Sequence, residues 1–320
     1  MLKKTIRRLG ALAMVLAMAV SVFAVNAFAA DGETTEEASA KPSFTKKYSY
    51  TGATPAEDLE YKITSKSAVN NTVAADANLE IAVAKAAASD KFEITLPAYQ
   101  GIGQFTYEMK ENTGDTAGVT YDAANIKVIV TRTWKEANAG TNESNINTAV
   151  AIQDADGTAK LTEVTNTFEV GSLTVTKKLA GSFYSLEDEF TIQVKFTAPT
   201  GKVVRSSFKI NDEVIDASKW ENGTYTATIQ LKGNESCTFT DLPVGVTYAV
   251  TETNKLGYED SYDRAQNGTI VADTTNTTVT NTKNAPPVTG VIKTVAPYAL
   301  MVVLAGAFAV VFLTRRNRAE

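Results

Sequence analysis

Three polar residue types recur in the same order in the two halves of this 320-residue chain. A neutral lysine amine is a nucleophile, and a protonated glutamate can polarise an asparagine carboxamide and transfer protons. Attack of the amine on the carboxamide would expel ammonia and leave a Lys–Asn isopeptide bond. The repeated motifs are Phe44-Thr45-Lys46-Lys47 and Val175-Thr176-Lys177-Lys178, Tyr107 to Glu111 and Tyr248 to Glu252, and Val164-Thr165-Asn166-Thr167 and Val279-Thr280-Asn281-Thr282.

These motifs lie in segments whose apolar residues alternate as they do in β-strands. Phe44, Lys46 and Tyr48 share one face of the first segment, and Val175 shares a face with Lys177 in the second. The lysine therefore points to the apolar side in both halves. Such a position is expensive, because an isolated buried ammonium loses its hydration or titrates to the neutral amine.

Two interpretations account for the inward lysines. A reaction that consumes the lysine and a nearby asparagine would remove the cost of burial, and a dry core would supply the proximity that the reaction needs. Alternatively, the lysines are edge-strand residues that form ordinary salt bridges with Glu111 and Glu252. An ordered triple that occurs twice favours the reaction.

The segments around the motifs predict the fold. Gly, Asn and Asp turns separate many short alternating runs, which indicates β-sandwiches, whereas residues 79–88 could form a short helix. The fold class is therefore all-β, with two tandem immunoglobulin-like β-sandwich domains at residues 42–168 and 169–283. The short connector from Thr167 to Ser172 favours a stacked rod. The clearest further strands are residues 91–96, 125–134, 189–196 and 225–231.

Composition excludes several classes of function. The chain has no histidine and one cysteine, Cys237, so it lacks the usual general base, the commonest metal ligand and any internal disulfide. Its net charge is −5, from 31 basic and 36 acidic residues, and no basic cluster lies outside the termini. We therefore expect no nucleic-acid partner, no metal and no cofactor.

The N-terminus has the composition of an export signal. A basic start and an apolar run over residues 11–25 precede Ala27-Phe28-Ala29, which predicts a signal peptide over residues 1–29 with cleavage after Ala29. A permanent membrane anchor is the alternative. Residues 30–41 are polar and acidic, as expected of a flexible tail. The basic residues are Lys3, Lys4, Arg7 and Arg8.

The C-terminus carries a second apolar run over residues 295–313. It is long enough to cross a bilayer as a helix at a rise of about 1.5 Å per residue. The basic residues of the segment 314–320 would remain in the cytoplasm. The sequence thus predicts a transmembrane helix, with everything between the two apolar runs outside the cell.

The stalk at residues 284–290, ahead of this run, contains Pro286, Pro287, Val288, Thr289 and Gly290. Together with the apolar run and the basic tail, this pentamer resembles the sorting signal of sortase substrates, with proline in place of the usual leucine. The resemblance implies that a sortase cysteine attacks the Thr289 carbonyl, releases Gly290 onward and passes the acyl group to an amine. The prolines are expected to keep the site extended. A single-pass protein with a proline-rich stalk is the alternative.

The repeated motifs resemble the pilin isopeptide-linkage domains, of type B collagen-adhesin-like fold, in Gram-positive pilus backbone subunits. The family pattern of Leu-Thr-Val-Thr-Lys, Val-Thr-Glu and Phe-Thr-Asn strands is matched more closely by the second half than by the first. The resemblance implies one bond from Lys46 to Asn166, assisted by Glu111, and another from Lys177 to Asn281, assisted by Glu252. Strand phase alone selects Lys46 over Lys47.

The same resemblance implies the role of a wall-anchored or polymerised surface protein, with sortase, neighbouring pilin subunits and peptidoglycan as partners. Polymerisation needs an acceptor amine, and Lys160 is the nearest lysine before Asn166, although an ordinary surface lysine is the alternative. A pilus shaft subunit is the main interpretation. A monomeric wall-anchored adhesin with an unidentified host ligand is the rival, and a surface hydrolase lacks an acid–base pair outside the triples.

Overall fold

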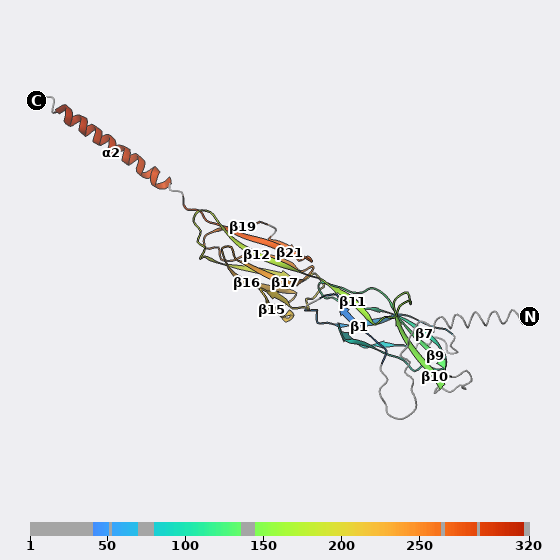
Figure 1. Ribbon diagram of the computed structural model, residues 1–320. Helices are drawn as coiled ribbons and strands as arrows, with labels where there is room; N and C mark the ends of the chain where they lie inside the picture. Colours follow the sequence, from blue (N-terminus) through green and yellow to red (C-terminus); the bar gives the residue numbers. More distant parts are fainter. Residues whose placement is uncertain are drawn as a thin grey trace, which may run out of the picture.

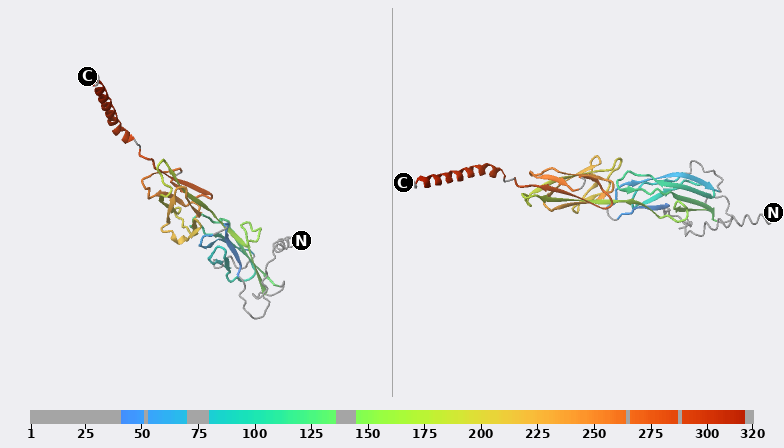
Figure 2. Two further views of the ribbon diagram at one scale, coloured as in Figure 1. Left: turned by 60° about the vertical axis from the view of Figure 1, so that its left-hand side comes forward. Right: turned by 90° about the horizontal axis from the view of Figure 1, so that it is seen from above.

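The computed structural model describes residues 41–50, 53–69, 80–135, 145–263, 266–286 and 289–316. Two β-sandwich domains lie end to end in an elongated molecule, with a helix beyond the second domain (Figures 1 and 2). This arrangement confirms the predicted class of tandem all-β domains. The predicted signal peptide, its cleavage point at Ala29 and the acidic tail up to residue 40 lie outside the described residues.

The described residues of the first domain form the strands β1 (Ser43–Tyr48), β2 (Asp58–Leu59), β3 (Tyr61–Val69), β4 (Ala82–Val83), β5 (Ala86–Ala87), β6 (Lys91–Thr95), β7 (Gly103–Glu111), β8 (Val119–Thr120), β9 (Ile126–Trp134), β10 (Ile146–Gln153) and β11 (Glu163–Phe168). A sheet in the order β4-β6-β1-β11-β8 faces a sheet in the order β10-β9-β7-β3. Inward side chains alternate along β6, β7 and β9, and they form one apolar core between the sheets.

The second domain repeats this plan with the strands β12 (Val170–Ala180), β13 (Glu189–Thr197), β14 (Phe208–Ile210), β15 (Glu213–Ile215), β16 (Thr224–Lys232), β17 (Ser236–Pro243), β18 (Thr247–Glu252), β19 (Glu259–Tyr262), β20 (Asn267–Thr269) and β21 (Thr274–Thr282). The sheets have the orders β15-β14-β17-β12-β21-β19 and β16-β13-β18-β20. A short 3₁₀ helix, Ala217–Lys219, follows β15.

In both domains the first strand lies beside the last strand and runs parallel to it. The registers place Lys46 opposite Val164 and Lys177 opposite Val279, and each valine lies two positions before the asparagine. Residues two positions apart on a strand point to the same face. The lysine and the asparagine therefore share the core face of one sheet, on adjacent strands.

The connector between the domains is shorter than the predicted segment from Thr167 to Ser172, because only Glu169 separates β11 from β12. Its backbone is bonded to both domains. The N–H of Glu169 donates to the Gly118 carbonyl at 2.9 Å, and its carbonyl accepts from the N–H of Val244 at 3.0 Å. The connector is thus held on both sides.

The loop after β7 crosses the joint and extends the structure of the second domain. Thr116 forms a parallel bridge with Val203, and Ala117 is buried among the core residues of the second domain. The guanidinium of Arg205 donates to Asp115 Oδ1 at 2.5 Å and to Thr116 Oγ1 at 2.8 Å. Backbone pairing, apolar burial and an ion pair therefore join the two domains.

The predicted helix at residues 79–88 is wrong. Its described part contains the short strands β4 and β5, which pair with β6 and β2. Alanine favours a helix locally, but Ile81 is buried in the core and the segment completes sheet edges. Tertiary pairing outweighs a weak local propensity here.

Helix α2 (Thr289–Arg316) contains the predicted apolar run 295–313, with Pro297 in its interior. However, no helix in the described part of the chain is both long enough and apolar enough to cross a membrane. The transmembrane assignment of residues 295–313 is therefore corrected to an apolar C-terminal helix. Residues 317–320 of the predicted basic tail lie outside the described part.

Ala117→Asp should loosen the joint. A carboxylate buried in an apolar core without a partner costs several kcal/mol, so the loop is expected to leave the second domain rather than keep the charge buried. Small-angle X-ray scattering should then show a broader distribution of interdomain distances. Ala155→Asp, in an exposed turn of the first domain, is the matched control. Unchanged scattering from Ala117→Asp would show that the loop does not hold the joint.

Candidate isopeptide sites

Each domain brings one lysine, one glutamate and one asparagine together in its core. The lysine comes from the first strand and the asparagine from the last strand of one sheet, whereas the glutamate ends a strand of the opposite sheet. Strand alternation turns all three inward, because each has an apolar residue two positions away on the same face. We call these groups the first cluster (Lys46, Glu111, Asn166) and the second cluster (Lys177, Glu252, Asn281).

In the first cluster the glutamate bridges the other two side chains. Lys46 Nζ lies 2.7 Å from Glu111 Oε2, and Asn166 Nδ2 donates to Glu111 Oε1 at 3.0 Å. Lys46 and Asn166 are 0% exposed and Glu111 is 4% exposed. The backbone N–H of Asp122 donates to Asn166 Oδ1 at 2.7 Å. Every functional atom of this cluster therefore has a partner inside the core.

The second cluster has the same arrangement, but its amine lies farther from the carboxyl group. Lys177 Nζ lies 3.6 Å from Glu252 Oε2 and 4.4 Å from the centre of the Phe190 ring, while Asn281 Nδ2 donates to Glu252 Oε1 at 2.7 Å. Lys177 Nζ also donates to the Val279 carbonyl at 3.4 Å. Among the described residues, no hydrogen-bond donor reaches Asn281 Oδ1.

Burial shifts the pKa values of Lys46, Lys177 and Glu252 in the direction that favours their neutral forms. It lowers the pKa of Lys46, against the opposing hydrogen bond and charge of Glu111. It likewise lowers the pKa of Lys177 to about 8 and raises the pKa of Glu252, and each partner of this pair opposes the shift of the other. A neutral amine and a protonated carboxyl group are the species that amide formation requires.

The geometry refines the chemistry expected of the glutamate. In both clusters one carboxyl oxygen faces the lysine and the other faces the nitrogen of the carboxamide, not its oxygen. The carboxyl group is therefore placed to move a proton from the nucleophile to the departing ammonia. Sequence reasoning missed the contacts of Asp122 and Phe190, since a backbone N–H and a core aromatic ring carry no distinctive motif.

Strand phase selected Lys46 over Lys47, and the structure places the two lysines on opposite faces. Lys46 is buried, whereas the side chain of Lys47 is half exposed and pairs with Glu163. Lys178 is likewise exposed beside the buried Lys177. The chosen lysines are therefore the ones that can reach an asparagine in the core.

The other predicted sites lie apart from the clusters. Lys160 is exposed and forms a β-bridge with Gln153 just before β11. Pro286 is exposed, whereas Pro287 and Val288 lie outside the described residues. The Thr289–Gly290 bond lies in the first turn of α2, so the expectation of an extended bond is wrong. The helix of the apolar run begins at Thr289.

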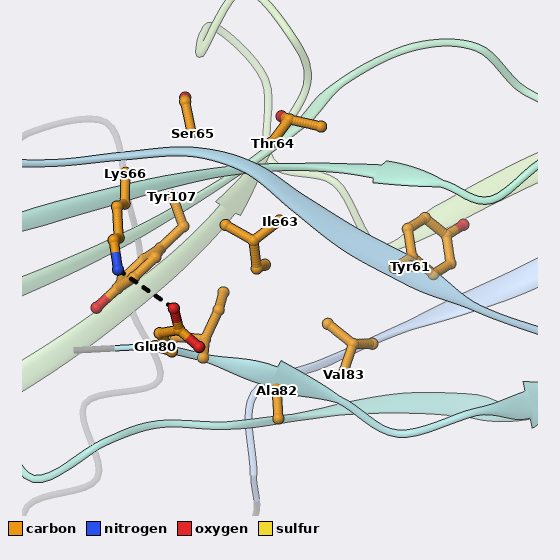
Figure 3. Close-up of a pocket in the computed structure, with 10 residues that line it drawn as sticks. Tyr61, Ile63, Thr64, Ser65, Lys66, Glu80, Ala82, Val83 and Tyr107 are labelled. Atoms are coloured by element: carbon orange, nitrogen blue, oxygen red, sulfur yellow. Dashed lines mark hydrogen bonds and ion pairs between the residues drawn. The ribbon is translucent and has the colours of Figure 1, made fainter. Parts of the chain in front are cut away.

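A cavity of about 490 Å³ lies between β3 and the segment Glu80–Val83 (Figure 3). It occupies an open side of the first sandwich, where β3 ends one sheet and β4 ends the other. Lys66 and Glu80 form an ion pair of 3.4 Å across it. No residue of the first cluster lines this cavity, so the cluster chemistry does not depend on it.

An Asn281→Ala variant, which cannot form the bond, should reveal the titration of Lys177. Its folded-state pKa of about 8 lies below the ordinary value of 10.5, so the unfolded chain binds more protons between these values. The free energy of unfolding should therefore rise with pH from about 8, by up to about 1.4 kcal/mol per pH unit. Denaturant titrations at several pH values would measure this rise.

The matched control is the double variant Lys177→Met, Asn281→Ala, in which the rise should disappear. Equal pH dependence of the two proteins would contradict the lowered pKa of Lys177.

Each half of the chain matches a different known protein family. Residues 33–169 match the family described as a Spy0128-like isopeptide containing domain. Residues 171–283 match a domain of unknown function, DUF7601. The isopeptide family is therefore matched by the half whose motifs resemble the family pattern less closely.

Two streptococcal pilins are similar to most of the chain. A pilin of Streptococcus pyogenes serotype M1 is 26% identical over 250 residues, which cover 71% of this chain and 72% of that protein. The major pilin protein T3.2 from Streptococcus pyogenes serotype GAS13637 has a similar fold, with a TM-score of 0.52 and 21% identity over 76% of this chain and 98% of that chain. The chain is thus similar in sequence to a streptococcal pilin, and its first domain matches the family of Spy0128-like isopeptide containing domains.

Proposed function

We propose that this chain is the shaft subunit of a pilus, polymerised by sortase through Thr289 and stiffened by two self-formed isopeptide bonds. The bonds join Lys46 to Asn166 and Lys177 to Asn281. The observation that carries the proposal is the repeated burial of a Lys on the first strand, an Asn on the last strand and a Glu from the facing sheet, in a chain similar to pilins. The subunit is structural, since each bond forms once and no substrate turns over.

Each bond forms within the folded core. The neutral lysine amine attacks the Cγ of asparagine, and the carboxyl group of the glutamate carries a proton to the leaving nitrogen, so ammonia departs. The cluster atoms are already held together, which replaces a collision between separate molecules. The buried charges disappear with the product, because an amide links two groups that were costly to bury.

The second bond lies on the line of tension along a shaft, and the first bond ties β1 to the strand that carries the load. A pull on Thr289 reaches Asn281, crosses to Lys177 and leaves through Glu169, which is bonded to both domains. It then enters β11 at its C-terminal end and runs along this strand to Lys160, the proposed acceptor of the neighbouring subunit. The strands between Lys177 and Asn281, and those of the first domain before Lys160, carry no load, so a pulled subunit need not unfold.

The same bonds restrict the unfolded chain. Each closes a loop of roughly 100 residues or more, and the chain-entropy argument for disulfides gives about 4–5 kcal/mol for such a loop. An amide, unlike a disulfide, resists reduction outside the cell. This suits a surface protein whose single cysteine, Cys237, is buried and free.

Polymerisation requires a sortase, a neighbouring subunit and an acceptor amine. The sortase forms an acyl-enzyme at Thr289 and passes it to a lysine of the next copy, or to peptidoglycan at the cell wall. Exposed Lys160, which precedes the asparagine strand of the first domain, is the proposed acceptor. The monomeric adhesin is not favoured, because the sequence relative is a pilin.

Intact mass and peptide mapping of the secreted chain test the bonds. The wild type should lack two ammonias, and peptides joined through Lys46–Asn166 and Lys177–Asn281 should be recovered. Lys46→Met should lack only one ammonia and should unfold more readily by about 4–5 kcal/mol. Lys47→Met, its exposed neighbour, is the matched control and should lack both. A wild type of unmodified mass would overturn the isopeptide proposal.

Polymerisation is tested separately in cells that express the sortase. Lys160→Arg keeps the charge but removes the acceptor amine, so the ladder of high-mass covalent species should collapse to a single species. Lys219→Arg, which alters an exposed lysine of the second domain, should leave the ladder intact. A normal ladder from Lys160→Arg would show that another lysine is the acceptor, and a single species in wild-type cells would favour the adhesin.

A further inference from the structure

The two clusters differ at the carbonyl oxygen of the asparagine. In the first cluster Asn166 Oδ1 accepts from the backbone N–H of Asp122 at 2.7 Å. In the second cluster Asn281 Oδ1 is buried, and no donor reaches it among the described residues. This atom becomes negatively charged when the amine attacks the carboxamide, so a donor at this position bears directly on the reaction.

We propose that the backbone N–H of Asp122 is a catalytic group of the first isopeptide reaction: it stabilises the oxyanion that forms on Asn166 Oδ1. This inference rests on the proposed function and adds a second catalytic group to Glu111. A fixed donor aimed at a developing negative charge inside a dry core is among the strongest catalytic devices in proteins.

The Asp122 donor also fixes which way the carboxamide faces. Its N–H can bond only to the oxygen of Asn166, so the amide nitrogen must face Glu111 Oε1, as it does at 3.0 Å. The other carboxyl oxygen, Oε2, contacts Lys46 Nζ at 2.7 Å. One oxygen of the Glu111 carboxyl group therefore contacts the attacking amine, and the other contacts the amide nitrogen that leaves.

These contacts balance the reaction. Lys46 Nζ forms a bond to Asn166 Cγ, and one electron pair of the C=O bond moves to Oδ1, where the hydrogen bond from the Asp122 N–H stabilises the negative charge. Glu111 takes the proton that Nζ loses and gives a proton to Nδ2, while the electron pair on Oδ1 re-forms the C=O bond and the C–N bond breaks. The products are one amide and one ammonia, and the carboxyl group ends in its starting form.

Local structure holds the Asp122 N–H in place. The strand after the glutamate, β8, pairs with β11 only up to Thr120, and the chain then turns. The Asp122 carboxylate accepts from the N–H of Ala124 at 2.8 Å, which fixes this turn. The corresponding strand of the second domain, β19, continues its ladder along β21 past Asn281, so its backbone stays within the sheet.

Replacement of the Asp122 amide by an ester tests the donor alone. Incorporation of malic acid, the hydroxy analogue of aspartate, at position 122 removes the N–H but keeps the carboxylate that fixes the turn. The matched control is lactic acid in place of Ala123, an ester one residue away. Full-length chains are made by cell-free synthesis, quenched at intervals and mapped for both cross-linked peptides by mass spectrometry.

The ester at position 122 should slow the Lys46–Asn166 cross-link by about 10²–10³-fold, as the loss of one oxyanion donor does elsewhere. The Lys177–Asn281 cross-link on the same molecules should keep its rate, and so should both cross-links of the Ala123 control. An unchanged Lys46–Asn166 rate in the Asp122 ester would overturn the inference. No ammonia loss in the wild type would instead overturn the proposed bonds themselves.

A second measurement does not depend on how the ester folds. In the unreactive Lys46→Met variant, the amide proton of Asp122 should exchange slowly with solvent, because it is hydrogen-bonded to Asn166. The additional change Asn166→Ala should speed its exchange at least tenfold, while the amide of Ala124 should be unaffected. Rapid exchange of the Asp122 amide in Lys46→Met would overturn the inference.

Discussion

The burial of a lysine, a glutamate and an asparagine in each apolar core is the constraint on which the rest of the structure depends. Charged groups lose their hydration inside a protein, so these side chains must contact one another closely. The first and last strands must therefore be parallel neighbours, with the asparagine two positions beyond the partner of the lysine. The glutamate must come from the facing sheet, and both sandwiches satisfy this condition in the same way.

The joint between the domains determines how tension passes from one sandwich to the next. A cross-linked domain resists tension only if the load enters and leaves through its linked strands. The single residue Glu169 connects the last strand of one domain to the first strand of the next, and it is hydrogen-bonded to both. The buried Ala117 and the ion pair of Arg205 then keep the two sandwiches aligned.

The two clusters share a plan but not a full set of contacts. The first holds its amine 2.7 Å from the carboxylate and bonds its carboxamide oxygen to a backbone N–H. The second has a carboxylate 3.6 Å from the amine and an aromatic ring beneath the amine. The family match to isopeptide domains falls on the first half. The half whose motifs are closer to the family pattern is therefore not the half whose cluster has the fuller set of contacts.

The sequence by itself determined the two all-β domains and the inward phase of Lys46 and Lys177, because alternation with a period of two is a local property of the chain. Repetition of the ordered triples likewise indicated which residues could meet. Only the tertiary structure decided that the alanine-rich segment after residue 80 pairs as strands, that Ala117 packs in the neighbouring domain and that the N–H of Asp122 reaches Asn166. These features depend on contacts between segments far apart in the chain, and a backbone N–H has the same chemistry at almost every residue, so no local pattern reveals them.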